Sequence, residues 1–433
     1  MISYVLGIVN IFFGALFILC YSYQVIFLII SLLKKPKIYP RTDERFRYAV
    51  LISARNEENV IDQLLESVKS QDYPSELIDV YVIADNCTDN TAGVARECGA
   101  CVIERHNTEL VGKGYAVSVL FDHINSSVGF DAYDGYFIFD ADNILEKDYI
   151  SEMNKCFASG ERLVTGYRNS KNFGETWISQ GYSVWFLREA RQLNGVRNLL
   201  GTTCEIKGTG FLIHKDIIKR QGGWIHHLLI EDVQFTIEKV LEGERVAYCD
   251  TAVFYDEQPT DLVTSWWQRL RWCRGYIQIL GRYTGKLLGA FFKGRGFSNY
   301  DMLMAMSPAF FISLAAVIVN ILGLILTLIF EPSLFLMSLA SSLLTGIGAY
   351  LLFLMVSFCT VMTERKRIRA TRGQRICAVL TFPIFMATYI PIAAAAIFAK
   401  PEWKQIKHKR ADESVVSVNE ENKKEKEMET SDK

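Results

Sequence analysis

The stretch Tyr136–Asn143, YFIFDADN, decides the fold. Apolar and aromatic residues typical of a buried strand are followed at once by two aspartates, Asp140 and Asp142. Residues two apart in a strand point to the same side, so both carboxylates are expected at one edge of a sheet. Such hard oxygen donors suit Mg²⁺ or Mn²⁺. The plainer interpretation is a polar turn, since Asp and Asn often follow strands.

Strand and helix patterns alternate around this stretch. Strands are predicted at 48–54 (YAVLISA), 78–85 (IDVYVIAD) and 101–105 (CVIER), and helices at 57–71, 91–97 and 114–124. This alternation predicts an α/β fold, a mostly parallel sheet with helices on its faces. Ligands of such sheets bind beyond the carboxyl ends of the strands, so the loops after Ala54, Ala84 and Phe139 should converge on one site.

Several loop residues are candidates for that site. Alone, each is more often an ordinary loop residue, but together with the aspartate pair they indicate a ligand site. Asp85 is placed to grip a base or ribose, and the glycines beside Lys113 let its ammonium approach a diphosphate. The glycines of 208–211 (GTGF) allow close backbone approach to a ligand. The candidates for substrate binding in these loops are Glu57, Asp85, Lys113, Gly208 and Thr209.

Asp232 begins an amphipathic helix pattern, IEDVQFTIEKVLEG. From spacing alone a helix N-cap is the favoured role, because Asp often fills it. The alternative is a general base that takes a proton from an acceptor hydroxyl.

The segment SWWQRLRWCRGY (265–276) places three candidate residues on one helical face: Gln268, Arg271 and Trp272. The guanidinium can bind a phosphate through two hydrogen bonds, and the indole offers a flat surface to a sugar. An amphipathic helix at a membrane surface is the plainer interpretation, and both can hold.

Hydropathy predicts an integral membrane protein. Residues 1–33, 302–330, 333–363 and 376–399 contain no charged side chain, and a crossing needs about 20 apolar residues. The first segment is an anchor rather than a cleaved signal peptide, because it lacks a basic start and a small-residue cleavage site. The predicted organisation is an anchor (1–33), a cytosolic domain (42–260), amphipathic interface helices (261–300), transmembrane segments (302–399) and a charged, disordered tail (400–433).

Flanking charges give the orientation. Lys34, Lys35, Lys37 and Arg41 follow the first span and place the polar domain in the cytoplasm. Pro383 and Pro391 interrupt the last apolar segment, which either crosses the membrane or re-enters on the same side. Ten cysteines without regular spacing suit a reducing compartment. With 47 basic and 48 acidic residues, no net field favours nucleic acid as a partner.

The motifs, taken in order, resemble the membrane-embedded processive members of glycosyltransferase family 2, which include cellulose, chitin, hyaluronan and poly-N-acetylglucosamine synthases. The resemblance runs from about Val50 to Tyr276 and rests on Asp85, Asp140/Asp142, the IED at 230–232 and Gln268-Arg-Leu-Arg-Trp272. One departure is Ile230, where the family usually has threonine.

This resemblance implies a GT-A fold and an inverting, metal-dependent mechanism. Asp85 would bind uracil and Lys113 the diphosphate. Asp140 and Asp142 would hold the metal-bound nucleotide. Asp232 would be the general base, so the resemblance overrides the N-cap role that its spacing favours. Gln268, Arg271 and Trp272 would close over the diphosphate and the acceptor sugar.

The expected function is elongation of a β-linked polysaccharide from a UDP-sugar, N-acetylglucosamine or glucose, at the cytoplasmic face of the cell membrane. Membrane lipids and an accessory export subunit are the further partners expected. The alternative enzyme adds one sugar to a membrane lipid. A transporter or scaffold with an inactive domain is disfavoured, since the spans hold no ionisable group and no motif carboxylate is missing.

Overall fold

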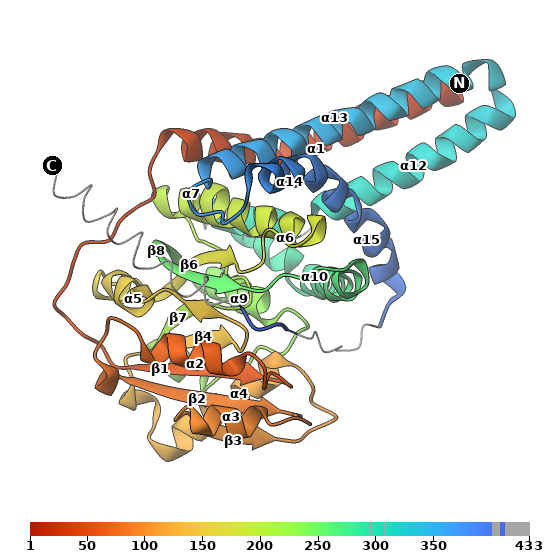
Figure 1. The fold of residues 1–433 in the computed structure, drawn as a ribbon. Helices are drawn as coiled ribbons and strands as arrows, with labels where there is room; N and C mark the ends of the chain where they lie inside the picture. The colour runs from red at the N-terminus through yellow and green to blue at the C-terminus, as the bar shows by residue number, and fades with distance from the viewer. Residues whose placement is uncertain (295, 307, 401–407, 412–433) are drawn as a thin grey trace. The chain divides into compact units, whose positions relative to one another are not determined.

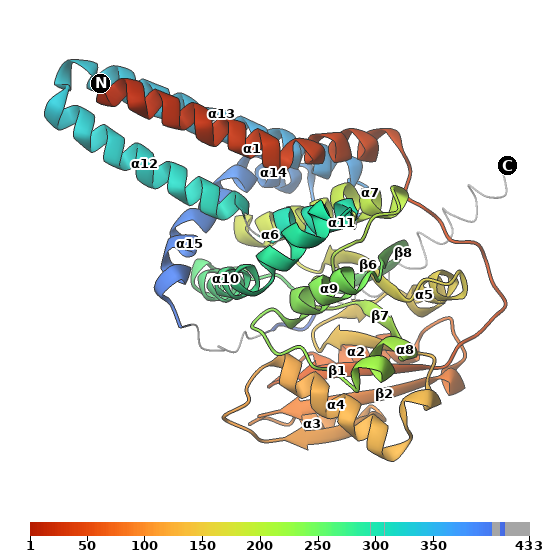
Figure 2. The same ribbon diagram turned by 180° about the vertical axis from the view of Figure 1, so that it is seen from behind.

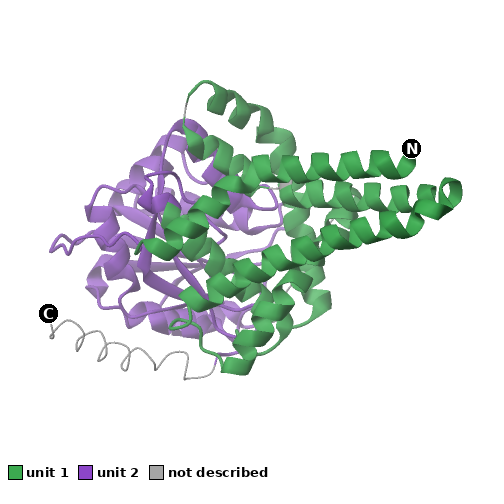
Figure 3. Ribbon diagram, turned by 90° about the horizontal axis from the view of Figure 1, so that it is seen from above, with its two compact units in different colours: residues 1–35, 173–196, 259–402 green, residues 36–172, 197–258, 403–433 purple. Residues whose placement is uncertain are grey.

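The computed structural model describes residues 1–294, 296–306, 308–400 and 408–411. The chain divides into two compact units, each made of several segments (Figure 3). Unit 1 comprises residues 1–35, 173–196 and 259–402, and unit 2 comprises 36–172, 197–258 and 403–433. Residues 173–196, which lie inside the predicted cytosolic domain, therefore group with the apolar helices.

Unit 2 is built on a mixed eight-stranded sheet of order β3-β2-β1-β4-β7-β6-β8-β5. The first four strands in this order are parallel, β7 is antiparallel to both neighbours, and β6 pairs with β8 in parallel. The strands are β1 (Tyr48–Ala54), β2 (Ile78–Asp85), β3 (Cys101–Arg105), β4 (Gly135–Asp140), β5 (Ile144–Leu145), β6 (Leu163–Ser170), β7 (Phe211–His214) and β8 (Val246–Asp256).

Helices cover both faces of this sheet. α2 (Ile61–Lys69), α3 (Thr91–Glu97) and α5 (Tyr149–Ala158) lie on one face (Figure 1). α4 (Lys113–Ser127), α8 (Lys215–Gln221) and α9 (Glu231–Glu242) lie on the other (Figure 2). Short turns η1 (Ser75–Leu77) and η2 (Phe130–Ala132) complete the unit, and α7 (Gly195–Leu199) lies where the chain passes from one unit to the other.

The parallel half of the sheet forms because its strands are apolar along their whole length. Val50 and Ile52 of β1 and Phe137 and Phe139 of β4 are fully buried in one core with α2 and α5. Burial of each such side chain contributes about 1.5–3 kcal/mol. Their register sets Ser53 of β1 beside Asp140 of β4, so adjacent strands end at one edge.

Unit 1 is helical. Its helices are α1 (Ile2–Leu33), α6 (Trp177–Arg188), the π-helix η3 (Glu189–Asn194), α10 (Leu262–Phe292), α11 (Phe297–Ala305), α12 (Pro308–Phe330), η4 (Pro332–Leu334), α13 (Phe335–Thr363), α14 (Arg372–Ala387) and α15 (Tyr389–Phe398).

Four segments in the described part of the chain are long and apolar enough to cross a membrane: Ile2–Leu33, Ala309–Phe330, Pro332–Thr363 and Arg372–Phe398. Polar contacts join the first two of them, since Asn10 and Asn320 exchange side-chain hydrogen bonds of 2.7 and 3.1 Å. The last segment holds Pro383 inside α14 and is broken at Thr388, where α15 begins.

Candidate functional site

The loops after β1 and β2 interlock at the carboxyl edge of the sheet, as predicted. Asn56 and Asn86 follow these strands with φ of 57° and 54°, a left-handed conformation that asparagine tolerates better than most residues. Asn56 Oδ1 accepts from the Thr88 amide at 2.7 Å, and the Glu57 amide donates to Thr91 Oγ1 at 2.8 Å. The two turns therefore hold each other in place.

Asp85, the expected uracil-binding residue, is buried at the end of β2. Its Oδ1 lies 2.5 Å from Arg105 Nη1, at the end of the neighbouring strand β3, and also accepts from Asn86 Nδ2 at 3.1 Å. The carboxylate is thus fixed in orientation by a buried charged pair.

Lys113 and Asp140 meet at the centre of this edge. Lys113 opens α4, and its ammonium bonds to the Asp140 carboxylate and, at 2.7 Å, to the carbonyl oxygen of Gly208. Although burial opposes a charge here, the Asp140 carboxylate raises the pKa of Lys113. A fixed, fully charged ammonium is suited to hold an anionic group.

Asp232 bonds to the backbone amide of the same glycine. Its Oδ2 accepts from the Gly208 amide at 2.5 Å. The N-cap of α9 is Ile230, so Asp232 lies within the first turn of the helix and does not fill the cap position that its spacing suggested. Gly208, with a φ of 81°, turns its carbonyl toward Lys113 and its amide toward Asp232.

Thr209 lies beneath the site. Its hydroxyl accepts from the Asp140 amide at 2.9 Å and donates to Asn143 Oδ1. Thr209 and Asn143 are both buried, and Asn143 Nδ2 continues to Asp256 at 3.0 Å. These bonds make Thr209 a support for the aspartate turn in this structure.

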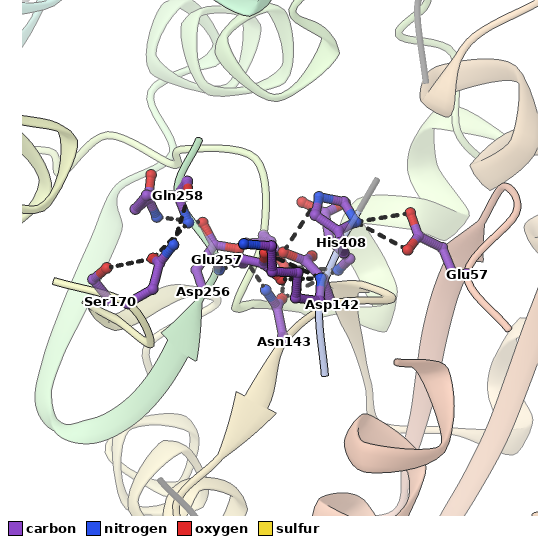
Figure 4. Close-up of polar contacts among 12 residues, drawn as sticks. Glu57, Asp142, Asn143, Ser170, Asp256, Glu257, Gln258 and His408 are labelled. Carbon is purple, nitrogen blue, oxygen red and sulfur yellow. Dashed lines mark hydrogen bonds and ion pairs between the residues drawn. The ribbon is translucent and has the colours of Figure 1, made fainter. Parts of the chain in front are cut away.

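A second group of carboxylates surrounds Asp142 (Figure 4). Asp256, the last residue of β8, is buried and accepts from Arg168 Nε at 3.0 Å and from Gln258 Nε2 at 2.9 Å. Burial and the neighbouring Asp142 raise the pKa of Asp256, against the opposing effect of Arg168. Burial is also the main cause that raises the pKa of Glu257 to about 7.

His408 lies between Glu57 and Asp142 (Figure 4). Its Nδ1 is 2.9 and 3.1 Å from the two carboxylate oxygens of Glu57, and its Nε2 is 3.9 Å from Asp142 Oδ2. Burial disfavours the imidazolium, but Asp142 and Glu57 outweigh it and raise the pKa of His408 to about 10. Burial in turn raises the pKa of Glu57.

The candidate ligands for a divalent cation are two aspartates, not a complete coordination shell of protein side chains. Within the described residues no group of three or more His, Cys, Asp or Glu is arranged to hold a metal ion. Asp140 and Asp142 nevertheless fit Mg²⁺ or Mn²⁺, because such ions take one or two carboxylates and complete their shell with water and substrate phosphates.

Gln268, Arg271 and Trp272 lie on α10 in unit 1. The Trp272 ring packs edge-on against Tyr182 and Phe186 of α6, with ring centroids 5.8 and 6.4 Å apart. These three residues belong to a different unit from the carboxylates above, so their closure over a diphosphate stays a prediction.

Four residues of this site were not anticipated from the sequence: Asn143, Asp256, Glu257 and His408. The first three carried a signal, because DADN and YDEQ both place polar residues directly after a strand. His408 carried none, since it belongs to a charged tail segment predicted to be disordered.

The family model described as glycosyltransferase like family 2 matches residues 45–275, more than half of the chain. A beta-monoglucosyldiacylglycerol synthase of Nostoc sp. is 24% identical over 62% of this chain and 57% of its own length. A poly-beta-1,6-N-acetyl-D-glucosamine synthase of Staphylococcus aureus is 25% identical over 58% and 59%. The chain therefore spans less than two thirds of the length of such curated relatives.

Among solved structures, the mannosyltransferase PcManGT of Pyrobaculum calidifontis, in complex with GDP-Man and Mn²⁺, has a TM-score of 0.57 at 16% identity. The match covers 91% of this chain and 99% of that one, and it confirms the predicted GT-A type of α/β fold. On its family match, this chain belongs to glycosyltransferase family 2 and is a sugar-transferring enzyme.

Proposed function

We propose that the protein transfers a sugar from a UDP-sugar to the end of a growing β-linked polysaccharide, with inversion, at the cytoplasmic face of the membrane. The observation that carries this proposal is the arrangement around Gly208. An ammonium from α4 and a carboxylate from α9 bond to the carbonyl and to the amide of one glycine, Gly208, beside the aspartate that ends β4.

Each residue has a separate role in this proposal. Asp85 binds the uracil, with its orientation fixed by Arg105. Lys113 holds the diphosphate, and its charge opposes the negative charge that develops on the leaving group. Mg²⁺ or Mn²⁺ at Asp140 and Asp142 supplies Lewis-acid neutralisation of the same group.

Asp232 takes the proton from the acceptor hydroxyl. The Gly208 amide holds one oxygen of this carboxylate at 2.5 Å, and the proposal assigns the proton transfer to the other. With one base and no nucleophilic side chain, a single displacement follows, so an α-linked donor gives a β-linked product. Glu57 and Gly208 line the donor side, Thr209 supports Asp140 from beneath, and Gln268, Arg271 and Trp272 bind the diphosphate and acceptor sugar.

A second candidate is the addition of one sugar to a membrane lipid. It is favoured by the Nostoc relative, whose name identifies a lipid glucosyltransferase. The polysaccharide proposal has its own support in the name of the Staphylococcus aureus relative. The four apolar helices are long enough to cross a membrane, which supports an acceptor at a membrane surface. Basic residues after the first of them favour a cytoplasmic location of unit 2.

The test is a screen of UDP-sugars by UDP release, on membranes that contain the full chain and Mg²⁺ or Mn²⁺. UDP-N-acetylglucosamine is the expected donor and UDP-glucose the next, with GDP-mannose as a control. The radiolabelled product is then sized. A ladder of long chains supports polysaccharide synthesis, a single lipid-soluble product supports lipid glycosylation, and no UDP release from any donor overturns both.

A further inference from the structure

A four-residue segment of the tail, His408–Ala411, lies directly on the proposed donor site, although some 350 residues of sequence separate it from Glu57, Asp62 and Gln63, which it contacts. We call this segment the latch. Both the latch and its partners belong to unit 2. Its four residues make contacts of three kinds: to the site carboxylates, to the loop after β8, and to α2.

The first contact brings the His408 imidazole to the carboxylates beside the proposed metal site. The His408 imidazole is 2.9 Å from Glu57 and 3.9 Å from Asp142. The side chains of the three residues are 18%, 12% and 7% exposed, so the imidazole largely covers the carboxylates. Asp140, the other aspartate of the pair, is already bonded to Lys113.

The other contacts hold the segment from outside the site. The Lys409 amide donates to both oxygens of Glu257 at 3.0 and 3.1 Å. Arg410 Nη1 lies 2.6 Å from Asp62 Oδ2. The Gln63 side chain donates to the Ala411 carbonyl at 2.9 Å and accepts from its amide at 3.0 Å, as a neighbouring strand would.

Charge complementarity explains why this segment fits here. The latch begins with three consecutive basic residues, His408, Lys409 and Arg410. His408 contacts Glu57, the Lys409 amide contacts Glu257, and Arg410 contacts Asp62. Each of these three contacts brings a basic residue or its backbone amide to a carboxylate, whereas Ala411 is held by the neutral side chain of Gln63.

We propose that the latch is an autoinhibitory element, in which His408 takes the place of the divalent cation and its diphosphate and must leave before the donor binds. This inference rests on the proposed function, which makes the carboxylates the donor site. A ligand that needs the open form binds with an apparent affinity reduced by the fraction of chains that are open. Loosening the latch from outside the site should therefore strengthen donor binding.

The experiment measures binding of Mn²⁺ and of UDP with Mn²⁺ to the full chain in detergent, by the electron paramagnetic resonance signal of free Mn²⁺ and by calorimetry. Arg410→Glu breaks the exposed pair with Asp62 and should lower the dissociation constant roughly two- to fivefold. Gln63→Ala removes two hydrogen bonds and should lower it roughly fivefold or more. His408→Ala should also lower the dissociation constant.

Lys69→Glu is the matched control. It makes the same change of charge as Arg410→Glu on the last turn of α2, away from the latch, and should leave binding unchanged. If the wild type binds UDP with Mn²⁺ and the three latch variants bind equally or more weakly, the latch is overturned and the proposed function stands. If neither the wild type nor any variant binds, the proposed function falls and the latch with it.

Discussion

Lys113 and Asp232 are both held by Gly208: the Lys113 ammonium donates to the Gly208 carbonyl at 2.7 Å, and the Asp232 carboxylate accepts from the Gly208 amide at 2.5 Å. The residue proposed to hold the leaving group and the residue proposed as the base are therefore separated by a single glycine. The relative placement of these two groups depends on the φ of 81° at Gly208.

Gly208→Ala is expected to lower kcat strongly. A left-handed alanine costs about 1–2 kcal/mol, and relief of that strain rotates the two peptide groups on either side of residue 208, which bond to Lys113 and Asp232. Misplacement by about 1 Å can cost roughly 10²-fold in rate. Gly222→Ala is the matched control, because Gly222 has a φ of 75° at the end of α8 with open space around its added Cβ. Equal loss of activity in both variants would contradict the role of Gly208.

Asp232→Asn is expected to abolish transfer while UDP binding persists. The amide oxygen can still accept from the Gly208 amide, so the turn is kept, but the side chain can no longer accept a proton. A loss of about 10²–10⁴-fold in turnover is expected for a general base. UDP binding by calorimetry and UDP release are measured on the same preparation. Retained turnover would remove Asp232 from the base role.

Asp142→Ala is expected to abolish metal-dependent UDP binding, and a chelator should do the same to the wild type. Asp134→Ala is the control, since Asp134 precedes the opposite end of β4 and bonds to the Arg47 amide and Lys215. Its substitution should affect stability only. An Mn²⁺ titration of Asp142→Ala that matches the wild type would show that this carboxylate is no ligand.

Glu161→Gln should destabilise unit 2 at neutral pH. Glu161 accepts two bonds of 2.8 Å from Arg245 and one of 3.0 Å from Tyr39. Burial opposes its charge, but Arg245 outweighs burial and lowers the pKa of Glu161 in the folded state. Charged hydrogen bonds of this kind contribute about 1.5–3 kcal/mol.

The pH dependence of that effect has a definite sign. Because the folded-state pKa is depressed, the contribution is fully present above the unfolded value of about 4.3 and is lost as the pH falls through the folded value. The gap in unfolding midpoint between wild type and Glu161→Gln, measured in detergent, should therefore stay constant from pH 7 to about pH 5 and shrink as the pH falls below about 4. A gap that widens on acidification would contradict the assignment.

Much of the parallel half of unit 2 could be predicted from the sequence, because its strands are apolar and bounded by polar loops. The predicted strands 48–54, 78–85 and 101–105 have the same bounds in the structure. The antiparallel strand β7 could not be placed in this way. It is only four residues long and joins β4 to β6, which are distant in the sequence.

The sequence predicted the site residues that lie at the ends of adjacent strands. It did not predict the roles of residues that depend on how a side chain is oriented. Thr209 sits between two glycines, so its spacing does not tell which way its hydroxyl points; the bond from the Asp140 amide decides that. Asp232 follows the helix start by one residue, and its spacing does not tell that Ile230 is the N-cap or that Asp232 bonds to Gly208. The contacts of His408 depend on the position of His408–Ala411 beside α2, which no local pattern encodes.

Arg269 connects α10, the helix that carries Gln268, Arg271 and Trp272, to the broken apolar segment formed by α14 and α15. This guanidinium is buried, lies 4.6 and 4.8 Å from the ring centroids of Phe385 and Tyr389, and donates to Thr388 Oγ1 at 2.6 Å. A change in the tilt of α14 and α15 should therefore move α10 as well. We expect the transfer rate in proteoliposomes to vary with acyl-chain length, and Arg269→Met to flatten that response.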